Sequence, residues 1–269
     1  MKLNKRNMFF LGALAGAVVS FPSRRKFDKI RIGNDNMKTL GMIGGTSWHS
    51  TIEYYRLLNS TVNERTDGLI SPPLLLYSIN VDLMRRADWD EINRAYLDIS
   101  QTLEGDGAEA IVLCANTPHK VYSYVQPKIS IPIIHIADAT ANEAKRLGLN
   151  SLGLLGTKPV MSGGFIPERI LEVSGINTIL PEAERQEDIH NAVVSKLVKG
   201  IFDEETRAFF KNEMDLLKDR GADGIILGCT ELPMLFDRED YELPMLDTTK
   251  LHAEMAVDFI LSEIESSTS

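Results

Sequence analysis

The stretch Gly-Ala-Glu-Ala-Ile-Val-Leu-Cys at residues 107–114 recurs, with one residue inserted, as Gly-Ala-Asp-Gly-Ile-Ile-Leu-Gly-Cys at residues 221–229. Two more stretches repeat in the same order. Leu-Gly-Met-Ile-Gly-Gly-Thr at 40–46 matches Leu-Gly-Leu-Leu-Gly-Thr at 152–157, and Ile-Pro-Ile-Ile-His at 131–135 matches Leu-Pro-Met-Leu-Asp at 243–247. One glycine-bounded apolar run is the ordinary pattern of a buried parallel strand and carries little weight alone. Three collinear matches at offsets of 112 to 114 residues predict two homologous lobes.

The segments around these repeats alternate between short apolar strands and longer helical patterns. Strands are expected at 40–43, 74–79, 110–114, 152–155, 177–180 and 224–228, and helices at 51–64, 91–105, 188–200 and 204–220. The prediction is an α/β fold of two pseudo-symmetric lobes, each a parallel sheet flanked by helices, with the active site in the cleft between them. We assign lobe 1 to 37–145, lobe 2 to 146–247, and a C-terminal helix that packs back on lobe 1 to 248–269.

Residues 1–36 form a leader with a basic start, an apolar run from Met8 to Val19, and small residues at Ala13, Ala15, Ala17 and Ser20. This pattern is typical of a secretory signal, and the apolar run is shorter than the roughly 20 residues that span a bilayer. Export, for example to the periplasm, is therefore one expectation. The alternative is translation from Met37, which would give a cytoplasmic protein.

Composition narrows the function classes. The formal net charge of -9 and the lack of a basic, aromatic-rich stripe argue against nucleic acid as a partner and favour a small-molecule substrate. The two cysteines cannot build a disulfide framework, and the five histidines form no spacing typical of a metal site. We expect no metal.

Cys114 and Cys229 each follow a predicted strand and precede a predicted helix start, with Thr117 and Thr230 as candidate N-caps. A lone cysteine there is more often a small core residue, but a symmetric pair favours chemistry. A helix N-terminus would lower the pKa of a thiol. Facing each other across a pseudo-twofold axis, the two could remove and deliver a proton on opposite faces of one substrate carbon, with no cofactor.

Other polar residues lie near these strand ends. Thr46, Ser47 and Thr157 occupy matching positions and could hold a substrate carboxylate. Ser50 and Glu53 fit a capping box, which is a structural role. Glu231 could bind substrate, orient Cys229 or simply favour the first helical turn, and His119 could polarise Cys114 or pack. Cations that could hold a distal carboxylate, each with solvated surface lysine as the alternative, are Lys158, Lys196 and Lys199.

These motifs resemble the aspartate/glutamate racemase family. The matching stretches are Gly-Met-Ile-Gly-Gly-Thr-Ser-Trp-His-Ser-Thr-Ile-Glu-Tyr-Tyr (41–55), Cys-Ala-Asn-Thr-Pro-His-Lys (114–120) and Gly-Cys-Thr-Glu-Leu-Pro-Met-Leu (228–235). The resemblance implies a cofactor-independent racemase, commonly a homodimer, in which Cys114 and Cys229 are the bases. It also implies that the substrate carboxylate is bound by Asn116, Thr117 and Thr230.

The second motif is similar to the aspartate branch, because glutamate racemases usually place His where Glu231 stands. Aspartate is therefore the first expected substrate, with glutamate or a broader range as alternatives. Val160 stands where family members often have Thr, so recognition of a side-chain carboxylate could differ. Two other functions remain open: a decarboxylase or cis–trans isomerase of a small dicarboxylate, and a non-catalytic amino-acid-binding protein.

Overall fold

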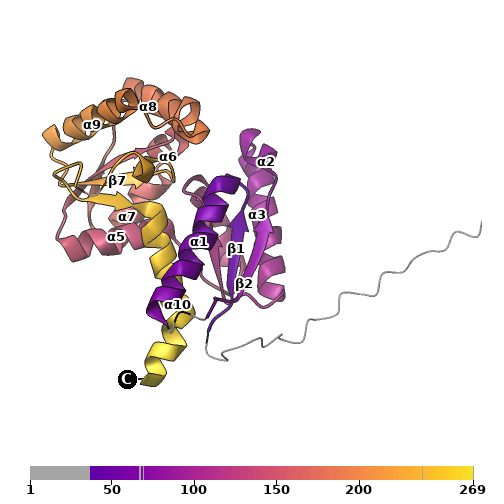
Figure 1. The fold of residues 1–269 in the computed structure, drawn as a ribbon. Helices are drawn as coiled ribbons and strands as arrows, with labels where there is room; N and C mark the ends of the chain where they lie inside the picture. The colour runs from indigo at the N-terminus through magenta and orange to yellow at the C-terminus, as the bar shows by residue number, and fades with distance from the viewer. Residues whose placement is uncertain (1–36, 67, 69, 238, 269) are drawn as a thin grey trace, which may run out of the picture. The chain divides into compact units, whose positions relative to one another are not determined.

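The computed structural model describes residues 37–268 except 67, 69 and 238, so the predicted leader at 1–36 lies outside the described residues. Within them the chain forms two four-stranded parallel sheets with the equivalent strand orders β2-β1-β3-β4 and β6-β5-β7-β8 (Figure 1). This confirms the predicted α/β fold of two pseudo-symmetric lobes. The strands of the first sheet are β1 (Leu40–Gly44), β2 (Leu74–Ser78), β3 (Ala110–Leu113) and β4 (Ile133–Ile134). Those of the second are β5 (Ser151–Gly156), β6 (Asn177–Ile179), β7 (Gly224–Gly228) and β8 (Met245–Asp247).

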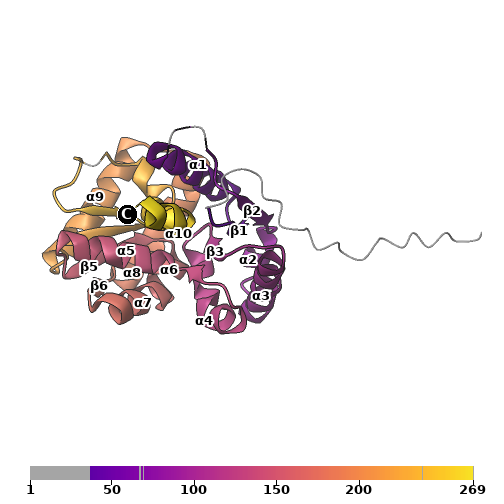
Figure 2. The same cartoon turned by 90° about the horizontal axis from the view of Figure 1, so that it is seen from below.

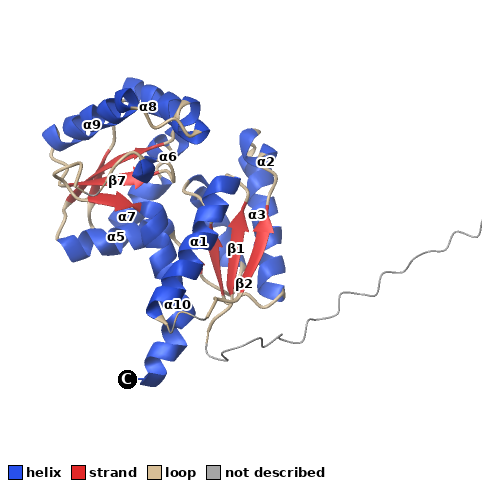
Figure 3. Ribbon diagram, viewed as in Figure 1, coloured by secondary structure: helices blue, strands red, loops and turns tan. Residues whose placement is uncertain are grey.

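Helices flank both sheets (Figure 3). The α-helices are α1 (Trp48–Arg65), α2 (Asp82–Arg85), α3 (Trp89–Gly105), α4 (Tyr122–Val125), α5 (Ile136–Leu147), α6 (Lys158–Ser162), α7 (Phe165–Ser174), α8 (Ala183–Ser195), α9 (Glu204–Asp219) and α10 (Thr248–Thr268). Short 3-10 helices are η1 (Thr117–Val121), η2 (Gln126–Lys128), η3 (Leu197–Lys199) and η4 (Leu232–Met234). None of the helices described is long and apolar enough to cross a membrane.

The structure differs from the sequence-based expectation in two local features. Each sheet has a fourth strand, β4 or β8, in the third repeated stretch, where three strands per lobe were expected. After each cysteine the chain forms a 3-10 helix rather than an α-helix, and these begin after Asn116 and Glu231. Thr117 and Thr230 are therefore not N-caps.

The two faces of the first sheet have separate cores. On one face, Leu40 and Met42 pack against buried side chains of α1 and α10. On the other, Ile43, Ile111 and Leu113 pack against α3. The second sheet belongs to one continuous core to which α5, α7, α8 and α9 contribute.

The helices that follow the last strand of each sheet are exchanged between the lobes. Helix α5 follows β4 of the first sheet, yet Ile136, Ala141 and Ala144 lie in the core of the second. Helix α10 follows β8 of the second sheet, yet Ala256, Val257 and Ile260 lie in the core of the first. The two helices also pack against each other, and α10 lies along α1 (Figures 1 and 2). This exchange holds the carboxyl ends of the two sheets at a common junction.

Candidate active site

Cys114 and Cys229 occupy equivalent places in the two sheets. Cys114 directly follows β3, which lies between β1 and β4, and Cys229 directly follows β7, which lies between β5 and β8. The backbone N–H of Cys114 donates to Ile43 O at 3.0 Å, extending the sheet by one bond. Both side chains are buried, with 2% and 7% of their surface exposed. The predicted symmetry of the pair is thus present in the fold.

Two hydrogen bonds beside the cysteines join the lobes. Ser50 Oγ, in the first turn of α1, lies 2.8 Å from Thr230 Oγ1 in the second lobe. Asn116 Nδ2 donates to Thr248 Oγ1 at 3.0 Å, and Thr248 Oγ1 donates in turn to Leu227 O in β7 at 2.9 Å. Both cysteine motifs therefore lie at the lobe junction.

The two thiols have different polar surroundings. Cys229 Sγ donates to Glu231 Oε2 at 3.1 Å, and Thr230 Oγ1 donates to the same oxygen at 2.9 Å. The Cys114 side chain makes no hydrogen bond to any residue that the structure describes. The pair is symmetric in position and asymmetric in chemistry.

Burial controls the protonation of both thiols. It raises the pKa of Cys114, and burial followed by the Glu231 carboxylate raises the pKa of Cys229. The prediction of lowered thiol pKa values is therefore wrong. Short helices follow both cysteines, the five-residue η1 leading into the four-residue α4 after Cys114 and the three-residue η4 after Cys229, and their dipoles do not offset desolvation.

Two of the predicted binding residues have unsatisfied buried atoms. Within the described chain, Asn116 Oδ1 and Thr157 Oγ1 are buried without a hydrogen-bond partner. Such atoms are uncommon in folded proteins and mark places where a ligand can bind. Thr46 Oγ1 lies 3.1 Å from Tyr96 Oη, and Thr117 is the first residue of η1.

The beginning of α1 differs from the predicted capping box. Ser47, not Ser50, is the N-cap, and its side chain accepts from Ser50 N–H at 3.3 Å. Glu53 pairs with Arg56 on the exposed side of the helix. The Ser50 hydroxyl is thereby left for the bond to Thr230, a role that sequence reasoning missed.

The lysines considered for a distal carboxylate are engaged or exposed. Lys158 Nζ lies 2.6 Å from Glu187 Oε2, and Lys196 Nζ lies 2.9 Å from Glu205 Oε2. Lys199 is exposed on η3. None of these bonds reaches the cysteine motifs.

Three buried imidazoles lie behind Cys114. The His119 ring is 4.7 Å from that of His135 and 5.1 Å from that of His252. His119 Nδ1 donates to Ala115 O, while His252 Nε2 donates to Ile134 O and its Nδ1 accepts from Tyr54. Burial lowers the pKa of His119 well below its usual value and that of His135 and His252 to about 3. Neutral His119 thus packs and orients backbone, and no contact joins it to the Cys114 thiol.

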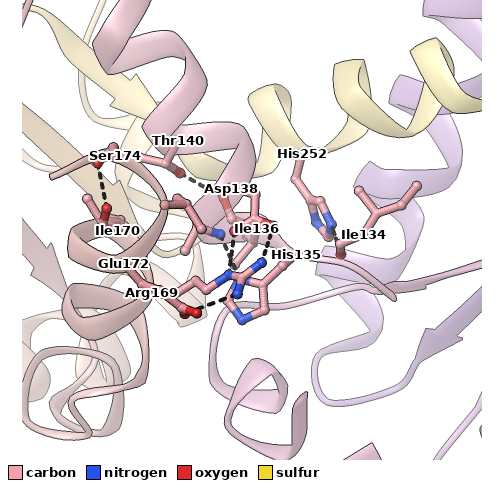
Figure 4. Close-up of polar contacts among 12 residues, drawn as sticks. Ile134, His135, Ile136, Asp138, Thr140, Arg169, Ile170, Glu172, Ser174 and His252 are labelled. Carbon is pink, nitrogen blue, oxygen red and sulfur yellow. Dashed lines mark hydrogen bonds and ion pairs between the residues drawn. The ribbon is translucent and has the colours of Figure 1, made fainter. Parts of the chain in front are cut away.

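An ion pair continues this cluster toward the second lobe. Arg169 on α7 makes a two-bond contact with Asp138 on α5, at 2.7 and 2.8 Å (Figure 4). The guanidinium also lies 5.1 Å from the centre of the Tyr122 ring, and Tyr122 packs edge-on against His135. Sequence reasoning missed this contact because its members are far apart along the chain.

A cavity of about 260 Å³ opens at the carboxyl end of β2. Its lining comes from β2, α2, α3 and the loops between them: Tyr77, Ser78, Ile79, Asn80, Asp82, Leu83, Arg86, Ala95 and Ile99. Its lining includes no residue of either cysteine motif. In the part of the chain that the structure covers, no three His, Cys, Asp or Glu side chains gather as metal ligands would.

Comparison with known proteins gives consistent matches over most of the chain. The profile of the Asp/Glu/hydantoin racemase family matches residues 43–256. The broad specificity amino-acid racemase RacX of Bacillus subtilis is 25% identical over 232 residues, covering 83% of this chain and 98% of RacX.

Solved structures agree. A crystal structure from Yersinia pestis that carries the Asp/Glu racemase name is 38% identical, with a TM-score of 0.79, and covers 84% of this chain and 100% of its own. An aspartate racemase homologue from Pyrococcus horikoshii is 29% identical, with a TM-score of 0.73, over 87% of this chain and 100% of its own. The glutamate racemase of Francisella tularensis shares the fold at 17% identity and a TM-score of 0.60, over 86% of this chain and 83% of its own.

Proposed function

Because the chain belongs to the Asp/Glu/hydantoin racemase family, we propose that it is a cofactor-independent amino-acid racemase that interconverts L- and D-aspartate. The observation that carries the proposal is the placement of Cys114 and Cys229 at equivalent strand ends, beside hydrogen bonds that join the two lobes. Two groups on opposite sides of one carbon are what racemisation without a cofactor requires.

In the proposed mechanism one cysteine, as thiolate, removes the α-proton while the other, as thiol, protonates the opposite face. Burial raises the pKa of both thiols and so favours their neutral form, and one must lose a proton before the reaction. Glu231 is the acceptor available to Cys229, since its carboxylate already accepts from Sγ. The two thiols then titrate as a coupled pair, which predicts a bell-shaped pH–rate profile.

The unsatisfied buried atoms suggest how the substrate is held. Asn116 Oδ1 can accept from the α-ammonium, and the Thr157 hydroxyl can donate to a carboxylate. The Thr230 hydroxyl already donates to Glu231, so we assign it to orienting the acid rather than to direct binding.

A broader substrate range is the second candidate, and the charges favour it. Lys158 and Lys196 are held by acidic partners, and the charged group in contact with the Cys229 thiol is the Glu231 carboxylate. One relative carries a broad-specificity name and another an aspartate racemase name. The family resemblance also predicts a homodimer, for which the exposed Trp48, Ile52 and Tyr55 on α1 offer an apolar surface.

The test is ¹H NMR of L-aspartate, L-glutamate and a panel of other amino acids with the protein in D₂O. We expect loss of the α-proton signal and formation of the D-enantiomer. Cys114→Ala, Cys229→Ala and the corresponding serine variants should each lower the rate by at least about 100-fold, because each removes one acid/base group. Unchanged circular dichroism and thermal unfolding would show that the variants fold.

The same spectra separate the other functions. Full activity in either cysteine variant would exclude the two-base mechanism. A decarboxylase or isomerase of a dicarboxylate would instead give new carbon-bound signals, and a binding protein would shift substrate signals without exchanging the α-proton.

A further inference from the structure

A chain of hydrogen bonds runs from the first lobe to the Cys229 thiol. Ser50 Oγ lies 2.8 Å from Thr230 Oγ1, Thr230 Oγ1 donates to Glu231 Oε2 at 2.9 Å, and Cys229 Sγ donates to the same oxygen at 3.1 Å. A hydroxyl has a single proton, and that of Thr230 goes to Glu231. Ser50 must therefore be the donor to Thr230, so the chain has one direction, from α1 toward the carboxylate.

Local helix structure does not explain the side chain of Ser50. The N-cap of α1 is Ser47, and the neighbouring Thr51 hydroxyl donates back to Ser47 O at 3.0 Å. Ser60, on the same helix, donates to Leu57 O at 3.2 Å. Ser50 has 3% of its surface exposed, and its hydroxyl bonds to the opposite lobe. A buried hydroxyl needs a partner, and here the partner adjoins a reactive thiol.

The hydrogen-bond chain from Ser50 reaches Cys229 and has no counterpart at Cys114. In the first lobe, Ala115 and Asn116 stand where Thr230 and Glu231 stand in the second. Ala115 has no hydroxyl, and the Asn116 amide donates to Thr248 rather than accepting from a thiol. A change at Ser50 should therefore affect Cys229 and leave Cys114 unchanged.

We propose that Ser50 is a positioning residue for Cys229: it donates across the lobe junction to Thr230 and so keeps the Glu231 carboxylate against the thiol. This rests on the proposed racemase function. When Cys229 is to act as base, its S–H bond breaks, the electron pair stays on sulfur, and the proton forms an O–H bond on Glu231. The resulting thiolate then takes the α-proton of the substrate.

The test compares Ser50→Ala with Ser60→Ala, which removes a hydroxyl from the same helix but has a local partner. Alkylation of each cysteine by iodoacetamide is followed by mass spectrometry across pH, with Cys114 as internal reference. Since Glu231 raises the pKa of Cys229, S50A should lower the apparent pKa of Cys229 and leave Cys114 unchanged. S60A should change neither. Loss of one bond in the chain should lower kcat about three- to tenfold with little change in KM.

The Glu231→Gln variant tests whether Ser50 acts through Glu231. If Ser50 acts through Glu231, S50A has no further effect on Cys229 alkylation in E231Q. Thr230→Val removes the hydroxyl that links Ser50 to Glu231 and should change the Cys229 alkylation profile as S50A does. It therefore replaces S50A in the test if S50A folds poorly. An unchanged Cys229 profile in S50A and T230V, equal shifts of both cysteines, or additive effects of S50A and E231Q would overturn the proposal. Thiol titration needs no turnover, so it gives a result even if no amino acid is racemised.

Discussion

Three histidines at the lobe junction show how burial sets the charge of a residue. His119, His135 and His252 are almost fully buried, and burial favours the neutral imidazole at each of them, although the hydrogen bonds of His119 and His252 to backbone carbonyls raise the pKa. Burial lowers the pKa of His135 and His252 to about 3, and Arg169 contributes to the shift at His135. Around His135 the charged groups are this guanidinium and its partner Asp138 (Figure 4). The cluster can tolerate protonation only at a cost in stability.

We predict that the cluster makes the protein sensitive to acid. Above pH 6.5 a histidine is neutral in both folded and unfolded states and contributes nothing to the pH dependence. As pH falls from about 6.5 toward 3, these histidines bind protons in the unfolded chain but stay neutral in the folded protein. The unfolding free energy should then decrease by roughly 1.4 kcal/mol per pH unit for each such histidine. Urea unfolding at a series of pH values measures this slope.

The variant His135→Asn separates the contribution of His135 to the acid sensitivity from those of His119 and His252. Asn can still accept from Ala137 N–H and cap α5, as His135 Nδ1 does at 3.1 Å, but it does not titrate. The variant should lose stability at pH 7, where packing against Tyr122 is missing, and show a shallower decrease below pH 6.5. His49→Asn, at an exposed position, serves as control. An equal slope in wild type and H135N would contradict the assignment.

At the scale of elements, the turn between β1 and α1 depends on Gly45. Its φ is +91°, and a Cβ there would lie 2.1 Å from Ile79 O and 2.6 Å from Ile79 N. The turn must pass close to the chain leaving β2 so that Thr46, Ser47 and Ser50 reach the junction. Glycine at this position therefore serves both the backbone angle and the close approach.

Gly45→Ala should destabilise the protein by more than the strain of an alanine at positive φ, because the added Cβ also clashes with the Ile79 backbone. The matched control is Gly148→Ala at the end of α5, where φ is +71° and no atom lies within 4 Å of the added Cβ. We expect about 1 kcal/mol of lost stability for G148A and a clearly larger loss for G45A, together with reduced activity because α1 moves. Chemical denaturation of both variants measures the difference. Similar losses would mean that the Ile79 backbone can move aside.

The sequence predicted the elements better than their contacts. The repeats located β1, β3, β5 and β7 and gave Cys114 and Cys229 their equivalent places, because strand pattern and turn residues are local. The strands β4 and β8 are two and three residues long, and the sequence analysis identified their stretches as a repeat without assigning them as strands. Ser47 and Ser50 are equally able to begin a helix, and the structure distinguishes them, because Ser47 accepts from Ser50 N–H as the N-cap while the Ser50 hydroxyl bonds to Thr230. The raised thiol pKa values depend on burial, which motif spacing does not reveal.

For the whole molecule, the exchange of α5 and α10 is the feature that unites the lobes. The sequence analysis expected the C-terminal helix to pack back on lobe 1, but it did not predict that α5 covers the second sheet, because an amphipathic pattern shows that a helix has an apolar face and not which sheet that face covers. Each sheet completes its core with a helix that follows the other sheet. Neither lobe has a full core by itself, and the two should unfold together.

We therefore predict that a cavity made in α10 weakens both sheets. Val257 is fully buried in the core of the first sheet, on a helix that also packs against α5 and contacts β7. Val257→Ala should lower the unfolding free energy by roughly 2 kcal/mol, while Val194→Ala, at a position on α8 with 46% of its surface exposed, should have little effect. Native-state hydrogen exchange reports the two sheets separately: amides of β1 and β3 for the first, and of β5 and β7 for the second. If the exchanged helices make one cooperative unit, V257A lowers protection in both sheets by the same free energy. Loss confined to β1 and β3 would instead mean that the second lobe is stable without α10, and the exchange would then join two independent folding units.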